Sequence, residues 1–509
     1  LAAERVALLG PAGAQLGDAD ALPLAGGAMT AYVLPDPLEE ALARLCNVGH
    51  FGELAAHRDL RLSEARLSAL PESFGQLTCL QHLRLRQNQL TALPEAFGQL
   101  SALQEVWLHH NLLARLPETF GNLSSLQQLK LSENRLEALP ESFGNLEALT
   151  QLELNQNFIS ALPESFSKLT ALQKLSMNAN RFSALPESFG RLSALQALSM
   201  NDNQLTALPE SFGELTNLTH VRINKNEVTV LPESFIHLID LQHLSLNENH
   251  LKELPDQFGQ LASLKQLELN QNELRCLPES FCLLSDLIHL RLNQNLLRAL
   301  PEGFGRLSAL RSLGLNENQL AELPESFGEL VALQQLALNE NQLAALPESF
   351  GALATLQTLG LSGNRLAALP EDFGLHGRLQ IVGLSDNLLS GLPSGFGQLR
   401  ALQTLGLRKN RLSTLPASFG QLGSLQTLGL EENELVSLPE SFGQLAELKQ
   451  LGLSGNRLAA LPESFDRLAA LDRLELDRML SLRRRLRRLL RAASRALCSA
   501  CLRRSRRGR

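Results

Sequence analysis

Aromatic side chains are scarce in this sequence of 509 residues. They make up 5% of the chain, with a single Trp and a single Tyr. The hydrophobic fraction of 44% rests mainly on leucine, so the interior that the chain can bury is aliphatic. The length would ordinarily suggest several domains, but repeat proteins grow by stacking one unit, so internal repeats have to be sought first.

Cysteines and long apolar runs are also lacking. The six cysteines are too few and too scattered for the disulfide-stapled caps of proteins from oxidising compartments. No run of eighteen apolar residues is present, so no membrane-spanning helix is expected. The N-terminal residues lack the basic and apolar regions of a secretory signal. We therefore expect a cytoplasmic protein with reduced thiols, peripheral at a membrane at most.

Acidic residues are absent from the last 31 residues, 479–509, which contain twelve Arg. Because the whole chain has a net charge of −7, residues 1–478 carry a net charge of −19. The body of the chain is therefore acidic and its C-terminal tail is strongly basic.

One 23-residue unit repeats through most of the chain. Asparagines recur in steps of 23 from Asn88 to Asn456, seventeen times, and prolines from Pro71 to Pro462, eighteen times. Eighteen of the 21 Phe keep the same step from Phe74 to Phe465. A period this strict predicts one structural unit stacked many times.

Each repeat is expected to contain a short strand. Apolar and polar residues alternate around Leu83 and Leu85, which is typical of a strand with one buried face. Neighbouring copies should therefore form a parallel sheet with one strand per repeat. Asn88 follows where the chain turns inward, and its amide is expected to pair with buried backbone groups.

The other half of each repeat predicts a short helix or 3₁₀ turn. In residues 70–77 a proline stands where a helical turn begins, and Glu72 lies beside its positive end. Phe74 and Leu77 are three residues apart and should point inward together. Because this half is bulkier than a strand, the stack should curve with the sheet on its concave side.

The motif Leu-x-x-Leu-x-Leu-x-x-Asn-x-Leu followed by Leu-Pro-Glu-Ser-Phe-Gly resembles leucine-rich repeats. The 23-residue length and the Leu-Pro-x-x-Phe step are similar to the intracellular Ras-group class, which includes plant intracellular proteins and Ras-pathway scaffolds. The resemblance covers residues 60–478. It implies an α/β solenoid, a horseshoe with a parallel concave sheet and short helices or 3₁₀ turns on the convex side. For function it implies a protein-binding scaffold or adaptor, in signalling for example.

The ends of the array divide the chain into four expected parts. Residues 1–35 are expected to be without fixed structure or a non-native leader. Residues 36–59 are predicted to form an N-terminal cap, because Asp36 and Glu39 make a capping box around Pro37 and an apolar helix face follows. Residues 60–478 form the array of about eighteen repeats. Residues 479–509 form an Arg-rich amphipathic helix and tail.

The basic tail allows three interpretations. Leucines share one predicted helix face, and the other face carries Arg483, Arg484, Arg485, Arg487, Arg488 and Arg491. Such a helix can bind an anionic membrane surface, which gives the alternative function of a membrane-surface adaptor. It can also cap the last repeat. Nucleic acid is disfavoured, because the tail has no aromatic residue to stack on bases. Cys498 and Cys501 form a lone Cys-x-x-Cys pair, a weak signal for zinc or acylation.

A partner is expected to contact side chains that leave the strands outward. The residue between the two strand leucines is chemically varied in the first eleven copies and nearly bare in the last seven, from Gly314 to Gly452. We predict that a protein partner binds the varied part of the concave face, through Arg84, Trp107, His109, His110, Lys130, Glu153, Arg222, Glu268 and Arg291. Trp107, between Arg84 and Lys130, has the residue type of a binding hot spot. The alternative is a tryptophan folded over its neighbours as local packing.

Two further columns of residues remain open to interpretation. Histidines at His82, His109 and His110 lack carboxylate or thiol partners at a fixed spacing, so we predict no metal site. His220, His243 and His289 form a secondary patch beside Arg222 and Arg291. A second asparagine column is either a structural ladder of amides or a polar docking strip, and it comprises Asn155, Asn178, Asn201, Asn224, Asn247, Asn270, Asn293, Asn316 and Asn339.

No pattern of catalysis is present in the sequence. There is no Gly-rich phosphate loop, no nucleophile elbow and no pair of carboxylates outside the repeat register. Some bacterial effector ubiquitin ligases join leucine-rich repeats to a catalytic domain, but a 31-residue tail is too short to hold one. We expect no enzyme activity, no cofactor and no small-molecule substrate.

Overall fold

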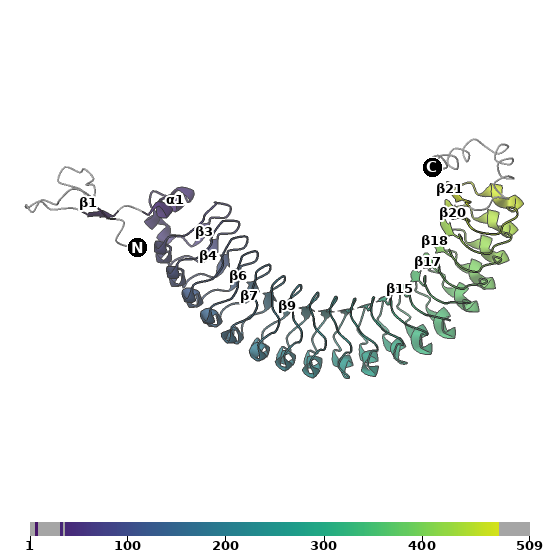
Figure 1. Ribbon diagram of the computed structural model, residues 1–509, viewed down its shortest axis with the longest axis horizontal. Coiled ribbons are helices and arrows are strands. Elements are labelled where there is room, and N and C mark those ends of the chain that lie inside the picture. The colour runs from purple at the N-terminus through teal and green to yellow at the C-terminus, as the bar shows by residue number, and fades with distance from the viewer. Residues whose placement is uncertain (1–5, 9–30, 34–35, 478–509) are drawn as a thin grey trace, which may run out of the picture. The chain divides into compact units, whose positions relative to one another are not determined.

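The computed structural model describes residues 6–8, 31–33 and 36–477 (Figure 1). The chain divides into two compact units between Arg181 and Phe182, which we call unit 1 and unit 2. The first residues described are two short strands, β1 Val6–Leu8 and β2 Ala31–Val33, which pair antiparallel. They lie within residues 1–35, for which the sequence predicted no fixed native structure.

Unit 1 contains a cap followed by a parallel ladder of short strands. Each strand pairs in register with the next, so residues 23 apart lie side by side. The strands are β3 Asp59–Arg61, β4 His82–Arg84, β5 Glu105–Trp107, β6 Gln128–Lys130, β7 Gln151–Glu153 and β8 Lys174–Ser176. The elements between and before them are α1 Pro37–Leu45 and the 3₁₀ turns η2 Phe51–Ala56, η3 Glu72–Gln76, η4 Glu95–Gln99, η5 Glu118–Asn122, η6 Glu141–Asn145 and η7 Glu164–Lys168.

Unit 2 continues the same repeat as a ladder of its own, with every strand parallel to its neighbours. Its strands are β9 Ala197–Ser199, β10 His220–Arg222, β11 His243–Ser245, β12 Gln266–Glu268, β13 His289–Arg291, β14 Ser312–Gly314, β15 Gln335–Ala337, β16 Thr358–Gly360, β17 Ile381–Gly383, β18 Thr404–Gly406, β19 Thr427–Gly429, β20 Gln450–Gly452 and β21 Arg473–Glu475. Its 3₁₀ turns are η8 Glu187–Arg191, η9 Glu210–Glu214, η10 Glu233–His237, η11 Phe258–Gln260, η12 Glu279–Leu283, η13 Phe304–Arg306, η14 Glu325–Glu329, η15 Glu348–Ala352, η16 Glu371–Leu375, η17 Ser394–Gln398, η18 Ala417–Gln421, η19 Glu440–Gln444 and η20 Glu463–Arg467.

The buried column of asparagines ties each repeat to the one before it. The side-chain amide of Asn88 donates to the carbonyl oxygens of Leu62 and Leu85 at 2.8 and 2.9 Å. Its Oδ1 accepts from the backbone N–H of Leu67 at 3.0 Å. These bonds satisfy backbone groups that the inward turn would otherwise bury unpaired. The predicted role of this column is confirmed.

The 3₁₀ turns pack a second column of the core. Phe74 and Leu77 are both buried, as their spacing predicts. The ring of Phe74 stacks on that of Phe97 with centroids 6.3 Å apart, and the same stacking recurs along each unit. Glycine follows the phenylalanine in most turns because the turns approach closely: a Cβ on Gly98 would lie 2.1 Å from the carbonyl oxygen of Thr119.

The N-terminal cap of unit 1 begins where the sequence predicts. Asp36 accepts a hydrogen bond from the N–H of Leu38 at 2.9 Å and starts α1. The Glu39 carboxylate accepts a hydrogen bond from the hydroxyl of Ser73 in the first turn of the array. Leu42 is buried, whereas Leu45 is half exposed at the end of the helix.

The predicted architecture is confirmed in its main features. In unit 2, Figure 1 shows the strands on the inner side of a curved stack and the turns on its outer side. The outer elements are 3₁₀ turns throughout both units, with α1 as the α-helix among the described residues. Each repeat therefore presents one strand to the inner surface, and that surface carries the candidate site.

Candidate functional site

Each strand presents two side chains to the outside of the sheet. Its middle residue is buried, while its first and last residues point outward, as in His82, Leu83 and Arg84 of β4. We call the first residues the early row and the last residues the late row. The late row contains Arg84, Trp107, Lys130 and Glu153 in unit 1, and Arg222, Glu268 and Arg291 in unit 2. Sequence reasoning treated the late row as the contact surface and overlooked most of the early row.

Trp107 lies between two cations on the neighbouring strands of unit 1. It pairs in register with Arg84 on β4 and with Lys130 on β6. The guanidinium carbon of Arg84 is 4.7 Å from the ring centroid, and Nζ of Lys130 is 5.6 Å from it. Both distances are within cation–π range. The ring is half-buried and packs against its neighbours, as the local-packing interpretation expects.

Carboxylates hold the two cations in place. Arg84 lies 3.7 Å from Oε1 of Glu105 and 3.9 Å from Oδ1 of Asp59. Nζ of Lys130 is 2.9 Å from Oε1 of Glu153, the next residue of the late row. Glu105 belongs to the early row. The 23-residue period places it on the strand next to that of Arg84, and its negative charge could therefore have predicted this contact from the sequence.

Three buried nitrogen atoms around Trp107 have no hydrogen-bond partner among the described residues. They are Nε of Arg84, Nε1 of Trp107 and Nδ1 of His109. His109 follows Trp107 by two residues, and the two ring centroids are 6.1 Å apart. Buried polar groups are nearly always paired in folded proteins, so a group of unpaired nitrogens marks a place where hydrogen-bond partners are missing. We call Arg84, Trp107, His109 and Lys130 the Trp107 cluster.

His109 in the cluster and His110, the next residue, differ in their surroundings. Burial lowers the pKa of His109, and the positive charges of His110 and Lys130 lower it further. Nδ1 of His110 instead lies 2.6 Å from a carboxylate oxygen of Glu133, on the exposed turn after β5. His110 has a left-handed backbone with φ of 56° and an exposed side chain, so we count only His109 in the cluster, although the two ring centroids are 5.5 Å apart.

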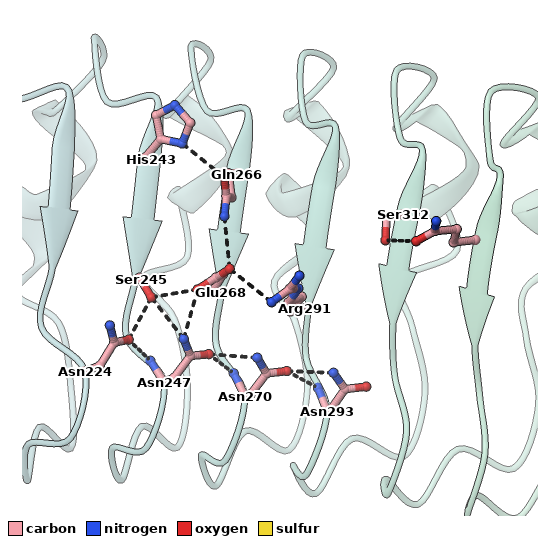
Figure 2. A network of polar contacts seen from close by, with 11 residues as sticks. Asn224, His243, Ser245, Asn247, Gln266, Glu268, Asn270, Arg291, Asn293 and Ser312 are labelled. Atoms are coloured by element: carbon pink, nitrogen blue, oxygen red, sulfur yellow. Dashed lines mark hydrogen bonds and ion pairs between the residues drawn. The ribbon is translucent and has the colours of Figure 1, made fainter. Parts of the chain in front are cut away.

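Of the predicted residues of unit 2, the structure brings Glu268 and Arg291 together. Arg222 is exposed between Ser199 and Ser245, its partners in register. Glu268 and Arg291 are neighbours on β12 and β13, with Oε1 and Nη1 3.4 Å apart (Figure 2). In the secondary patch, the rings of His220 and His243 stack with centroids 4.5 Å apart.

The second asparagine column forms a hydrogen-bonded ladder. Oδ1 of Asn247 accepts both the backbone N–H and the side-chain amide of Asn270, at 2.8 and 2.9 Å. Oδ1 of Asn270 accepts the corresponding groups of Asn293 in the same way (Figure 2). These contacts support the structural interpretation of this column, and the half-buried amides also border the inner surface.

Other predictions receive no test from the described part of the chain. The tail residues Arg483, Arg484, Arg485, Arg487, Arg488 and Arg491, with Cys498 and Cys501, lie outside the described residues. Within residues 36–477, no group of three or more His, Cys, Asp or Glu side chains is arranged to hold a metal ion. None of the helices in the described ranges has the length and apolar character to cross a membrane.

Comparison with protein families identifies the repeat. Models of leucine-rich repeat regions match residues 38–135 and 232–316. Leucine rich repeat models match residues 137–182, 377–435 and 425–478, and a further one matches residues 125–146. Among curated proteins, a sequence search finds no match.

Several solved structures are similar to this chain. A leucine-rich-repeat protein of Leptospira interrogans is 33% identical, with a TM-score of 0.61 over 83% of this chain and 96% of its own. The ectodomain of the Arabidopsis thaliana membrane receptor kinase GASSHO1/SCHENGEN3, in complex with Casparian strip integrity factor 2, is 31% identical, with a TM-score of 0.58 over 80% of this chain and 54% of its own. YopM from Yersinia enterocolitica is 25% identical, with a TM-score of 0.55 over 86% of this chain and 93% of its own.

Proposed function

Because the chain belongs to the leucine-rich-repeat family, we propose that it is a non-catalytic scaffold that binds a protein partner on its strand surface, with the Trp107 cluster as the main contact in unit 1. The plant receptor ectodomain that is 31% identical to this chain is in complex with Casparian strip integrity factor 2, which supports a binding role for the repeats. The cytoplasmic location and a role in signalling are parts of the same proposal.

The observation that carries this proposal is the group of unpaired nitrogens around Trp107. The indole N–H and the Nε–H of Arg84 are donors without acceptors among the described residues. A protein partner brings backbone carbonyls and side-chain oxygens that can accept from them once the side chains adjust. Tryptophan and arginine are also the residue types that most often dominate binding energy at interfaces.

The proposal is tested by replacing Trp107 with Ala. Proteins captured from the native cell by the full chain are purified, and their affinities for the parent and the variant are measured directly. A hot-spot tryptophan contributes on the order of 2 kcal/mol or more, which is about 30-fold in affinity. Phe158→Ala, at an exposed aromatic residue of unit 1 that lies outside the strands, is the control. A variant that keeps the parent affinity for every captured protein contradicts the proposal.

The membrane-surface alternative rests on a different part of the chain. The spacing of Arg483, Arg487 and Arg491 against the leucines of the tail supports a basic face that binds anionic lipid. Binding of lipid by the tail would localise the array and is compatible with a protein partner on the strands. Vesicle binding tests it separately, as described in the Discussion.

A further inference from the structure

A shallow depression lies on the strand surface of unit 2 where the late row loses its side chains. Arg291 on β13 is followed in register by Gly314, then Ala337 and Gly360. The depression has a volume of about 320 Å³. Its lining includes Arg291, Ser312, Gln335 and Thr358 from the strands, together with Asn293 and Asn316 of the asparagine ladder.

On the other side of Arg291, the carboxylate of Glu268 accepts hydrogen bonds from three other side chains (Figure 2). It accepts from the amide of Gln266 at 2.9 Å, from Ser245 at 3.0 Å and from Asn247 at 3.1 Å. Burial alone would raise the pKa of Glu268, but these hydrogen bonds outweigh it and lower the pKa below its usual value. Glu268 therefore stays ionised, and its hydrogen bonds contribute more to this than the charge of Arg291 does.

Arg291 keeps most of its hydrogen-bonding capacity. A guanidinium has five N–H donors in a planar fork, and among the described residues that of Arg291 contacts one carboxylate oxygen, at 3.4 Å. Its side chain is 59% exposed. Because Gly314 occupies the next position of the late row, no side chain of that row covers the guanidinium on the side of the depression.

The polar groups that line the depression include further donors. The amide of Asn293 donates along the ladder to Oδ1 of Asn270 at 2.8 Å. The amide nitrogen of Asn316 makes no such bond among the described residues, although its backbone N–H does. The hydroxyl of Ser312 makes only a long contact of 3.4 Å with Gln335. The lining of the depression thus contains the exposed guanidinium of Arg291, the side-chain amide of Asn316 and the hydroxyl of Ser312, and it contains no carboxylate.

We propose that this depression binds the side-chain carboxylate of an aspartate or glutamate in an extended segment of a protein partner. The inference rests on the proposed function in that the partner is a protein on the strand surface. A carboxylate matches the planar fork of arginine and forms charge-assisted hydrogen bonds with it. Glu268 holds Arg291 from the opposite side, so less side-chain freedom is lost when the carboxylate binds.

The proposal is tested with a random dodecapeptide library selected for binding to the full chain. We expect the enriched peptides to share an acidic residue, and its replacement by Asn or Gln to weaken binding at least tenfold. Arg291→Gln should cause a similar loss. Combining Arg291→Gln with the neutral peptide should add little further loss, because both changes remove the same contact.

A matched pair of variants at Gly314 gives a second test. Glu at this position would place an internal carboxylate beside Arg291, as Glu268 does on β12, and should abolish peptide binding. Gln has nearly the same size without the charge, so Gly314→Gln should reduce binding less. Arg306→Gln, at an exposed arginine of the outer turn η13, serves as the control, and circular dichroism checks that each variant folds.

Three outcomes overturn the proposal: no peptide is enriched, the enriched peptides share no acidic residue, or Arg291→Gln and Gly314→Glu bind them as tightly as the parent. Trp107→Ala separates this inference from the proposed function. If acidic peptides bind at Arg291 while Trp107→Ala leaves all captured partners bound, the Trp107 contact is contradicted and the carboxylate site is supported. If Trp107→Ala releases the partner and no acidic peptide binds at Arg291, the Trp107 contact is supported and the carboxylate site is contradicted.

Discussion

The guanidinium carbon of Arg84 lies 4.7 Å from the centroid of the Trp107 ring, on the strand next to it. Arginine covers the ring with both its charge and its aliphatic stem, and so keeps water from part of the indole. Trp107 is the single tryptophan of the chain, so the intrinsic tryptophan fluorescence of the protein reports on this one place.

Removal of the Arg84 side chain should expose the indole. We predict that Arg84→Ala shifts the tryptophan emission maximum to longer wavelength, because water gains access to the ring. Arg222→Ala in unit 2 removes a late-row arginine that has no aromatic neighbour in register and should leave the spectrum unchanged. An unshifted spectrum of the Arg84 variant would show that the ring is not covered by this side chain in solution.

The stability of unit 2 should depend on pH through His376. This histidine is fully buried, with Nδ1 3.1 Å from the carbonyl oxygen of Leu353, and Nε2 has no partner among the described residues. Burial lowers its pKa, while the Leu353 carbonyl and Asp372 oppose that effect. An unfolded histidine, with a pKa of about 6.5, then binds a proton more readily than the folded one. Stability is therefore full above about pH 6.5 and falls as the pH decreases below it.

Leucine occupies the position of His376 in the neighbouring repeats, at Leu353 and Leu399. We predict that His376→Leu stabilises the protein by about 1–3 kcal/mol, because it removes a buried polar atom without a partner. The urea concentration at the midpoint of unfolding should also fall less between pH 8 and pH 5.5 in this variant than in the parent. His250→Leu, at an exposed histidine beside Glu273, is the control. Equal pH dependence in parent and His376→Leu would exclude His376 as the source.

The buried asparagines should be necessary for stability one by one. Asn272 donates to the carbonyl oxygens of Leu246 and Leu269 at 2.9 and 3.1 Å, and accepts from the N–H of Leu251 at 3.0 Å. Asn272→Ala leaves these groups unpaired and should cost about 2–4 kcal/mol, measured by urea unfolding. Gln271→Ala, at the exposed residue just before it, should change little. If Asn272→Ala lowers the free energy of unfolding no more than Gln271→Ala does, the structural role of Asn272 is contradicted.

The repeat period predicted the fold, whereas the side-chain contacts of the candidate site became known only from the three-dimensional structure. A 23-residue step fixes which residues are neighbours across the sheet, so Arg84, Trp107 and Lys130 could be placed side by side from sequence. The period does not show which donors remain unpaired. The saturation of Glu268 by residues of two neighbouring strands, and the open side of Arg291 beside Gly314, follow from side-chain directions that the sequence pattern does not contain. Ser312 and Gln335, in the early row, were overlooked for that reason.

The C-terminal tail provides the test of the membrane alternative. We predict that the full chain co-sediments with vesicles containing anionic phosphatidylserine, and that truncation after residue 478 abolishes this binding, because the twelve Arg of residues 479–509 supply the attraction. Vesicles of neutral phosphatidylcholine are the control. Binding should also weaken as the salt concentration rises. Equal sedimentation of both forms with anionic vesicles would remove the tail from the function.

The bonds of Asn88 and Asn272 have the same partners one repeat earlier, at offsets of 21 and 26 residues. Excision of 23 consecutive residues from the interior of unit 2 would join two repeats that offer the same carbonyls, N–H groups and phenylalanine ring to each other. Excision of a length that is not a multiple of 23 would leave amides facing the wrong backbone atoms. Loss or gain of whole repeats therefore preserves the contacts between neighbouring repeats. The number of strands in the array can change in evolution while the structure of each repeat stays the same.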